Sequence, residues 1–310
     1  MITIEGSGRS GERSLGFRFA DVHPKAKLNI SFQRTLRVPQ DGESYPLPAG
    51  FGGLPLKHIE DFADKFSDTD LSRGGVLMPM YQSEATWLNF SGDYPMAIKV
   101  ATGKINAVTG QAWSDELNGN PQDYVVTPDQ DWLDGFCVEK GKVRQFVAQP
   151  LGAGETVEEI LTGKSDFGGI QILVMPMKLS DYIKRFETVP TSRRDESFDD
   201  VLYMRAPQMK CMSASMGIAA GGFIEQEIYE DEFGIEVWDT SAAVRCFVHV
   251  VNSQQYESIT GEATPHKPIT QKQYLERGIP WFSHYKDGAP LSGGAFEALG
   301  KSPVVSSGMF

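Results

Sequence analysis

Residues 28–38, LNISFQRTLRV, alternate between apolar and polar side chains and predict one long β-strand. Arg34 interrupts the apolar face of this strand. Arginine is rarely buried without a carboxylate or an anionic ligand. We therefore expect Arg34 to be buried and paired with a carboxylate. The rest of that face consists of Leu28, Ile30, Phe32, Leu36 and Val38.

Beyond this strand the chain continues in short apolar runs that are separated by turn residues. Thr102-Gly103 and Lys140-Gly141 lie where hairpin turns are needed, and the chain contains 32 glycines and 18 prolines. Frequent turns between short strands favour a sandwich over a parallel α/β sheet. The predicted fold class is mainly β, a β-dominated α+β fold with sandwich-like antiparallel sheets. Further strands are predicted at 76–81, 85–90, 96–101, 104–108, 123–127, 136–139, 142–149, 201–212, 222–229, 233–238 and 242–251.

Helices are predicted in two places. Apolar residues at helical spacing indicate a short helix near 56–66. A small C-terminal helical cap follows the last strand. Its first helix begins at Asn252, with Gln255 at the capping-box position and Gly261 as the stop, and its second spans 271–277 with Thr270 as the N-cap.

The expected domain organisation follows from these patterns. Residues 1–26 are rich in Gly, Ser and charge and predict an irregular lead-in. A β-rich lobe at 27–177, an exposed loop or joint at 178–200, a second β lobe with two C-terminal helices at 201–285 and an irregular tail at 286–310 follow. Segments 151–172 and 219–237 resemble each other. Either the lobes are duplicated, or two glycine-led hairpins are alike because hairpin chemistry offers few solutions.

Composition restricts the environment and the partners. The chain has 310 residues and a formal net charge of −12, which repels phosphate backbones and anionic membranes. We therefore expect no nucleic-acid partner and no membrane partner. Cys137, Cys211 and Cys246 are far apart and predict buried reduced thiols. Apolar runs shorter than a membrane span, and an N-terminus without the apolar core of a signal peptide, predict a cytoplasmic protein.

Several segments resemble a known group of proteins. These are FQRTLRVP at 32–39, NPQDYVVTPDQDWLDG at 120–135, VRQFVAQPLGAGETVE at 143–158 and residues 221–229. They resemble an uncharacterised family of bacterial cytoplasmic proteins, and the resemblance covers most of the chain. It implies a bacterial cytoplasmic origin, but it implies no catalytic residue and no cofactor because we know of no activity for that family.

Three aspartates are candidate metal ligands. Asp129, Asp131 and Asp134 precede Gly135 in a short loop, and the first two have the alternate spacing that calcium ligands use. The spacing then departs from that of an EF-hand loop, and no glutamate occupies the twelfth position. The alternative is an acidic turn anchored by Trp132.

Six residues are candidates for binding or catalysis. Glu225 and Glu227 would share a strand face and could act as an acid/base pair, although acidic runs are usually solvated. His249 and Arg245 would likewise share a face. Arg34, Arg144 and Arg245 lie inside apolar strand patterns, so they form either structural ion pairs or an anion site. A GxGxxG match at 6–11 lacks the following helix and acid, and no cofactor is expected.

Two functions of different classes fit these observations. We predict a non-catalytic protein that self-associates or binds a partner, most simply a homo-oligomeric assembly component, because hairpins create sheet edges that can be used for assembly. The apolar residues of the C-terminal VVSSGMF would help to build the contact. The alternative is an enzyme or small anionic-ligand binder that uses a pocket between the lobes, lined by arginine and carboxylates. No motif decides whether the chain is an enzyme.

Overall fold

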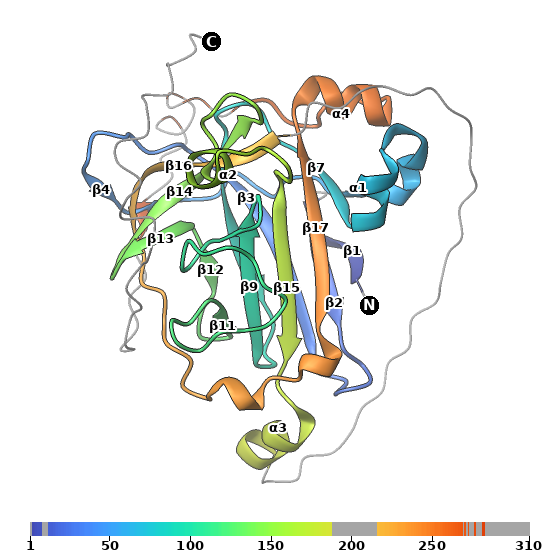
Figure 1. The fold of residues 1–310 in the computed structure, drawn as a ribbon, viewed down its shortest axis with the longest axis vertical. Helices are drawn as coiled ribbons and strands as arrows, with labels where there is room; N and C mark the ends of the chain where they lie inside the picture. Colours follow the sequence, from blue (N-terminus) through green and yellow to red (C-terminus); the bar gives the residue numbers. More distant parts are fainter. Residues whose placement is uncertain are drawn as a thin grey trace.

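The computed structural model describes residues 2–7, 12–187 and 216–268, together with positions 270, 272, 276 and 281–282. Two large mixed β-sheets and a few short helices confirm the β-dominated α+β fold class. Figure 1 shows β9, β15 and β17 running side by side across the front of the molecule, with β2 and β3 behind them.

The first sheet contains the strand that was predicted from the 28–38 alternation. This strand is β3, and its side chains alternate between buried and half-buried positions, although it ends at Thr35. The order is β1 (Ile2–Ser7), β2 (Glu12–Arg18), β3 (Lys27–Thr35), β8 (Ala85–Ser91), β14 (Lys142–Pro150), β16 (Met216–Glu225) and β4 (Ser44–Tyr45), with β12 (Trp132–Leu133) on β8 and β13 (Gly135–Glu139) on β14.

The second sheet packs against the first. Its order is β10 (Ile105–Asn106), β9 (Met96–Thr102), β15 (Ile170–Pro176), β17 (Val244–Val251), β7 (Val76–Pro79) and β6 (Lys57–His58), with β11 (Val125–Thr127) on β9. Most pairs are antiparallel as expected, but β4 runs parallel to β16 and β7 runs parallel to β17. A separate small sheet pairs β18 (Trp281–Phe282) with β5 (Leu47–Pro48).

One hydrophobic core is shared by both sheets. Phe17 and Phe32 contribute to it from the first sheet, and Ile98 and Ile172 contribute from the second. All four side chains are fully buried. Burying a side chain of this size contributes about 1.5–3 kcal/mol, so the contact between the two sheets stabilises the fold strongly.

The predicted division into two lobes is wrong. β16 and β17 both come from the predicted second lobe, yet β16 joins the first sheet and β17 joins the second. Neither sheet is therefore built from one half of the chain. Strand pairing depends on contacts that are distant in sequence, and local patterns do not specify these contacts.

The expectation of an irregular lead-in at 1–26 is also wrong. β1 and β2 form an antiparallel pair, and β2 continues the sheet onto β3. Leu15 and Phe17 are completely buried. The glycine, serine and charge around them obscured a short alternating strand whose apolar side chains face the core.

The helices are short and lie at the ends of strands. The helix predicted at 56–66 is a 3-10 helix with a kink at Phe62. Residues 233–238, predicted as a strand, contain a 3-10 turn instead, and part of the predicted loop at 178–200 is helical. The helical elements are η2 (Ile59–Lys65), α1 (Asp68–Arg73), α2 (Val157–Thr162), α3 (Leu179–Phe186), η3 (Ile235–Val237), η4 (Thr240–Ala242) and α4 (Ser253–Thr260).

The predicted helix at Asn252 is confirmed. It is α4, in which Asn252 accepts the Gln255 backbone N–H at 2.9 Å, the Gln255 side chain completes the capping box, and Gly261 ends the helix in the left-handed conformation. Most of the predicted helix at 271–277, the strand at 201–212, Cys211 and the tail at 286–310 lie outside the described residues. Among the helices that the structure describes, none is long and apolar enough to cross a membrane.

Buried glutamines join two segments that strand pairing leaves unconnected. Gln122, Gln130 and Gln226 lie at the junction of segments 122–134 and 226–231. Each side-chain oxygen accepts a backbone N–H from the other segment, and each side-chain nitrogen donates to backbone carbonyl oxygens, over distances of 2.7–3.2 Å. The amides thus replace the hydrogen bonds of a missing strand pair.

Candidate functional site

Arg34 is buried and paired as predicted. Its Nε donates to Oε1 of Glu84 over 2.9 Å, and both side chains are less than a tenth exposed. Arg34 also donates to the backbone carbonyl of Lys267, which ties the segment after α4 to the core. Because Glu84 already balances its charge, Arg34 has a structural role.

Arg144 is a second buried arginine with a structural role. Its guanidinium donates to the backbone carbonyl oxygens of Gly221 and Ala220, both over 3.0 Å, and lies over the Phe223 ring. Burial lowers the pKa of Arg144. These contacts span the point where the register between β14 and β16 shifts, so Arg144 stabilises an irregular pairing.

The three aspartates do not converge on one point. Asp131 is exposed, whereas Asp134 is buried, and its Oδ2 accepts the Trp132 indole N–H over 3.2 Å. Burial raises the pKa of Asp134 well above 3.8, while the Trp132 hydrogen bond opposes that rise. No group of three potential metal-ligating side chains occurs in the described part of the chain. The calcium interpretation of Asp129, Asp131 and Asp134 is therefore wrong, and the Trp132-anchored turn is what forms.

The predicted acid/base pair and His249 occupy separate environments. Glu225 is exposed at the last position of β16, and Glu227 lies beyond the strand and is half-buried. His249 is buried on β17, where its Nε2 lies 3.0 Å from the Gly74 carbonyl oxygen and its ring packs against Phe247. Burial lowers the pKa of His249, so its imidazole is neutral at pH 7. His249 is therefore a packed side chain, and Glu225 and Glu227 belong to a solvated acidic run.

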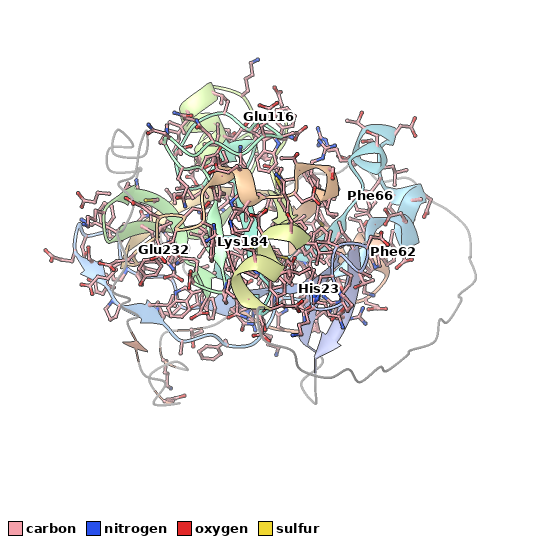
Figure 2. All side chains as sticks on the ribbon, turned by 90° about the horizontal axis from the view of Figure 1, so that it is seen from below. His23, Phe62, Phe66, Glu116, Lys184 and Glu232 are labelled. Atoms are coloured by element: carbon pink, nitrogen blue, oxygen red, sulfur yellow. The ribbon has the colours of Figure 1, made fainter. Side chains whose placement is uncertain are left out.

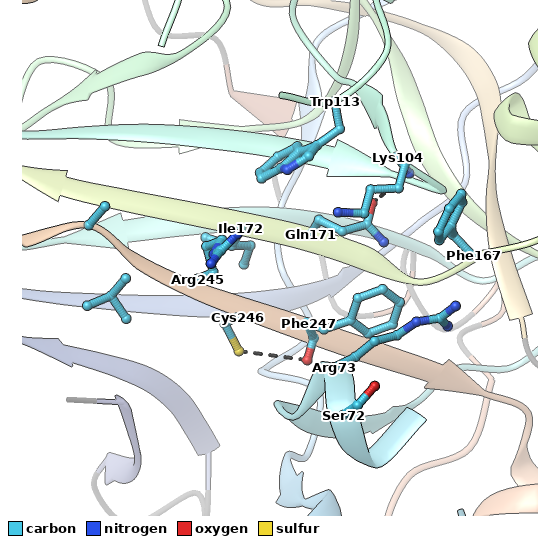
Figure 3. Close-up of a pocket in the computed structure, with 12 residues that line it drawn as sticks. Ser72, Arg73, Lys104, Trp113, Phe167, Gln171, Ile172, Arg245, Cys246 and Phe247 are labelled. Carbon is cyan, nitrogen blue, oxygen red and sulfur yellow. Dashed lines mark hydrogen bonds between the residues drawn. The ribbon is translucent and has the colours of Figure 1, made fainter. Parts of the chain in front are cut away.

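Arg245 is the one sequence-predicted candidate that lines a large cavity within the described part of the chain. This cavity, here called the basic pocket, has a volume of about 730 Å³ and lies beside β15 and β17 (Figure 3). Arg245 and Phe247 are two residues apart on β17 and project from the same face, and Phe247 lies opposite Gln171 of β15 in the sheet. The lining residues are Ser72, Arg73, Lys104, Trp113, Phe167, Gln171, Ile172, Ala243, Val244, Arg245, Cys246 and Phe247.

Aromatic rings hold two of the three pocket cations. The Arg73 guanidinium lies 5.5 Å from the centroids of both Phe167 and Phe247. The Lys104 ammonium lies 5.3 Å from the ring of Trp113. A cation over a ring face is attracted by the ring quadrupole. The rings therefore restrict where these positive charges can lie within the basic pocket.

The pocket cations differ in their counter-charges. Arg73 pairs with Asp70 over 3.3 Å, and Arg245 pairs with Asp115 over 2.5 Å. Lys104 has no carboxylate or carbonyl partner for its Nζ among the residues that the structure describes. Burial lowers the pKa of Lys104; Asp115 opposes this effect, and Arg245 and Arg73 add to it.

The backbone at Lys104 is held in an unusual conformation. Gly103 and Lys104 form the turn between β9 and β10 with positive φ angles of 55° and 63°. A type I′ hairpin turn favours glycine or asparagine at both positions, so a lysine there is strained by about 1 kcal/mol or more. The buried Gln171 amide fixes this turn, because its Oε1 accepts the Lys104 backbone N–H over 2.8 Å.

A buried glutamate fixes the neighbouring wall of the basic pocket. The two carboxylate oxygens of Glu158 accept the backbone N–H groups of Asp166, Phe167 and Gly168 over 2.7–2.9 Å. Gly168 in turn accepts the backbone N–H of Gly103 over 3.2 Å. The loop before β15 and the turn that bears Lys104 are thus one connected unit.

Sequence reasoning missed Arg73, Lys104 and Trp113. They lie in separate surface segments, and only the pairing of β9, β15 and β17 brings them together. One local signal pointed to Lys104. It follows Gly103 in a two-residue hairpin turn, at a position where glycine or asparagine is favoured.

Comparison with known proteins found no matching family model, no matching curated protein and no matching solved structure. The resemblance to an uncharacterised bacterial family stays a prediction, and the function of the basic pocket is argued from its own chemistry.

Proposed function

We propose that the basic pocket binds a small organic anion. The observation that carries this proposal is the charge of its lining. Within the described residues, the lining contains Arg73, Lys104 and Arg245 but no carboxylate, in a chain whose formal net charge is −12. Cations gathered in one cavity of an acidic protein attract and concentrate small anions.

The balance of charge within the basic pocket supports this function. Asp70 and Asp115 each form an ion pair with one arginine from outside the lining, which leaves Lys104 without a direct ion-pair partner among the described residues. A bound carboxylate or phosphate would supply the missing charge and accept hydrogen bonds from the guanidinium groups. The volume of about 730 Å³ falls within the range of about 300–1,000 Å³ that is common for small-molecule sites.

Isothermal titration calorimetry with inorganic phosphate, succinate and lactate tests this proposal. At least one of these anions should bind to the full-length protein, and Arg245→Gln should weaken that binding. Arg185→Gln is the matched control, because Arg185 also lies over an aromatic ring, Phe233, but does not line the pocket. Absence of binding, or equal loss in both variants, would contradict the proposal.

Self-association remains a second proposed function, and one surface favours it. Leu179, Ile183 and Phe186 lie along one face of α3 and are 40%, 44% and 51% exposed, and Ile235 beside them is 40% exposed. Figures 1 and 2 place α3, which carries Lys184, at one end of the molecule. An exposed apolar group of this kind is typical of a contact surface. The residues of the C-terminal VVSSGMF, which are predicted to help build the contact, lie outside the described residues.

Light scattering of the full-length protein at micromolar concentration tests self-association. Ile183→Asp should lower the measured mass if the α3 surface forms the contact. Ile160→Asp is the control, because Ile160 on α2 is exposed to a similar extent, 40% against 44%. A wild-type protein that is monomeric would exclude this second function and leave the anion proposal unaffected.

A further inference from the structure

We propose that Lys104 is a reactive amine that forms an imine with a carbonyl compound bearing a negative charge. The proposal rests on the proposed function, because Arg73 and Arg245 would hold the anionic group of the same ligand. The class of substrate is a small oxo acid, which combines a carboxylate with an aldehyde or ketone. The basic pocket would then carry out covalent chemistry as well as binding.

The contrast between two lysines on one indole ring supports this role. Lys99 and Lys104 have ammonium groups 5.4 Å and 5.3 Å from the Trp113 ring. Lys99 is completely buried, and its Nζ contacts Asp123 over 2.6 Å and donates to Ser114 and Glu116. Lys99 is therefore a structural lysine whose ammonium already has an ion-pair partner and hydrogen-bond acceptors.

Lys104 differs from Lys99 in its exposure and in the polar contacts of its ammonium group. Among the described residues its Nζ has no hydrogen-bond or ion-pair partner, it is half-buried, and it lines the cavity. Figure 3 shows Lys104 between Trp113 and Phe167 at the pocket wall. An amine in this position is accessible to a ligand, and within the described part of the chain no carboxylate is hydrogen-bonded to it.

The surroundings of Lys104 raise the share of the neutral amine, which is the nucleophilic form, above that of an exposed lysine. Burial lowers the pKa of Lys104 as the largest effect, and Arg245 and Arg73 contribute in the same direction while Asp115 opposes them. Desolvation and neighbouring cations are the two arrangements that activate a lysine amine. The strained turn and the Gln171 hydrogen bond hold the lysine backbone in place, which fixes the origin of the side chain.

The proposed step is balanced without any further reactant. Lysine ammonium first loses a proton to solvent, and the neutral Nζ forms a bond to the carbonyl carbon while the carbonyl π electrons move to oxygen. The resulting carbinolamine loses its oxygen as water after protonation, which leaves a positively charged iminium between Lys104 and the ligand. The sum is ammonium plus carbonyl compound giving iminium plus water.

Reductive trapping tests the imine directly. Full-length protein is incubated with pyruvate and sodium cyanoborohydride, and the reduced adduct is located by peptide mass spectrometry. We expect one dominant adduct at Lys104, its absence in Lys104→Arg, and its retention in Lys142→Met. Lys142 is the matched control, because its ammonium also lies over a ring, Phe223, but outside the pocket. Arg245→Gln should slow trapping by pyruvate more than trapping by neutral acetone, because both reactions lose the effect of Arg245 on the Lys104 pKa but only pyruvate loses a contact to its carboxylate.

Calorimetry with lactate separates failure of the imine from failure of anion binding. Lactate has the carboxylate of pyruvate but no carbonyl group. Lactate binding without a Lys104 adduct would overturn the imine and leave the proposed function intact. If phosphate, succinate and lactate all fail to bind and Lys104 is not labelled, both proposals are overturned. Labelling spread evenly over Lys104 and Lys142 would also overturn the imine proposal.

Discussion

Arg34 and Glu84 form a buried ion pair in which the arginine Nε donates to the carboxylate Oε1 over 2.9 Å. The second carboxylate oxygen of Glu84 accepts the backbone N–H of Tyr81 over 3.0 Å and lies 3.7 Å from Nε2 of His266. The pair thus connects β3, the turn before β8 and the segment after α4, and its loss should affect all three.

Arg34→Leu should destabilise the protein strongly. Removing one partner of a buried ion pair leaves an uncompensated charge, which costs about 3–5 kcal/mol in free energy of unfolding. The double variant Arg34→Leu with Glu84→Leu should recover part of this loss, because no charge then remains buried. Urea unfolding followed by circular dichroism measures both. A single variant with the wild-type midpoint would show that the pair contributes nothing.

Asp134→Asn should stabilise the protein at neutral pH. Burial raises the pKa of Asp134 well above 3.8, and its Oδ1 is buried without a hydrogen-bond partner in the described structure. A pKa raised on folding means that the contribution of Asp134 to stability is complete below about pH 3.8 and is lost as pH rises through the folded-state pKa. The advantage of the asparagine should therefore grow with pH and exceed about 1 kcal/mol at pH 7.

Urea unfolding of wild type and Asp134→Asn at several pH values measures this effect. Asp131→Asn is the control, because Asp131 is an exposed neighbour and its replacement should leave the pH profile unchanged. Parallel profiles for wild type and Asp134→Asn would disprove the assignment of Asp134 as a destabilising buried acid.

Asn252→Ala should cost about 1 kcal/mol through the loss of the N-cap of α4. The capping side chain accepts the Gln255 N–H over 2.9 Å, and alanine has no oxygen to replace it. Asn252→Asp should retain most of the stability, because aspartate is an equally good N-cap. Thermal unfolding compares the three proteins, and equal melting temperatures would refute the role of the cap.

Gln130→Leu should cost about 2 kcal/mol or more, because it leaves backbone groups of both segments without partners. The buried amide donates to the carbonyl oxygens of Trp132 and Glu227 and accepts the N–H of Tyr229. Gln33→Leu is the control, because Gln33 is half-buried and donates to one serine hydroxyl. Similar unfolding free energies for the two variants would contradict the bridging role.

Local patterns in the sequence predicted many of the elements but not their assembly. The alternation at 28–38 predicted β3, and the asparagine–glutamine–glycine spacing predicted α4 from its N-cap to its stop. Both signals depend on residues close in sequence. The parallel pairing of β4 with β16 depends on segments more than 170 residues apart, and no local periodicity encodes such a partner.

The candidate site was harder to predict for the same reason. Arg245 was identified as a cation on a strand, but its neighbours Arg73 and Lys104 come from a helix end and a hairpin turn. Arg144 occupied an equivalent pattern and became a structural donor, because it lies at a register shift between β14 and β16. Similar local sequences can therefore give a pocket cation or a buried one, and the sheet register decides between them.

The positions of β16 and β17 in the two sheets determine when each sheet can be completed during synthesis of the chain. β16 lies inside the first sheet between β14 and β4, and β17 lies inside the second between β15 and β7. During translation, the first sheet would keep unpaired internal edges until β16 ends at residue 225, and the second until β17 ends at residue 251. Such edges are prone to aggregation. A nascent chain of this protein would therefore benefit from chaperone protection until β17 has been made.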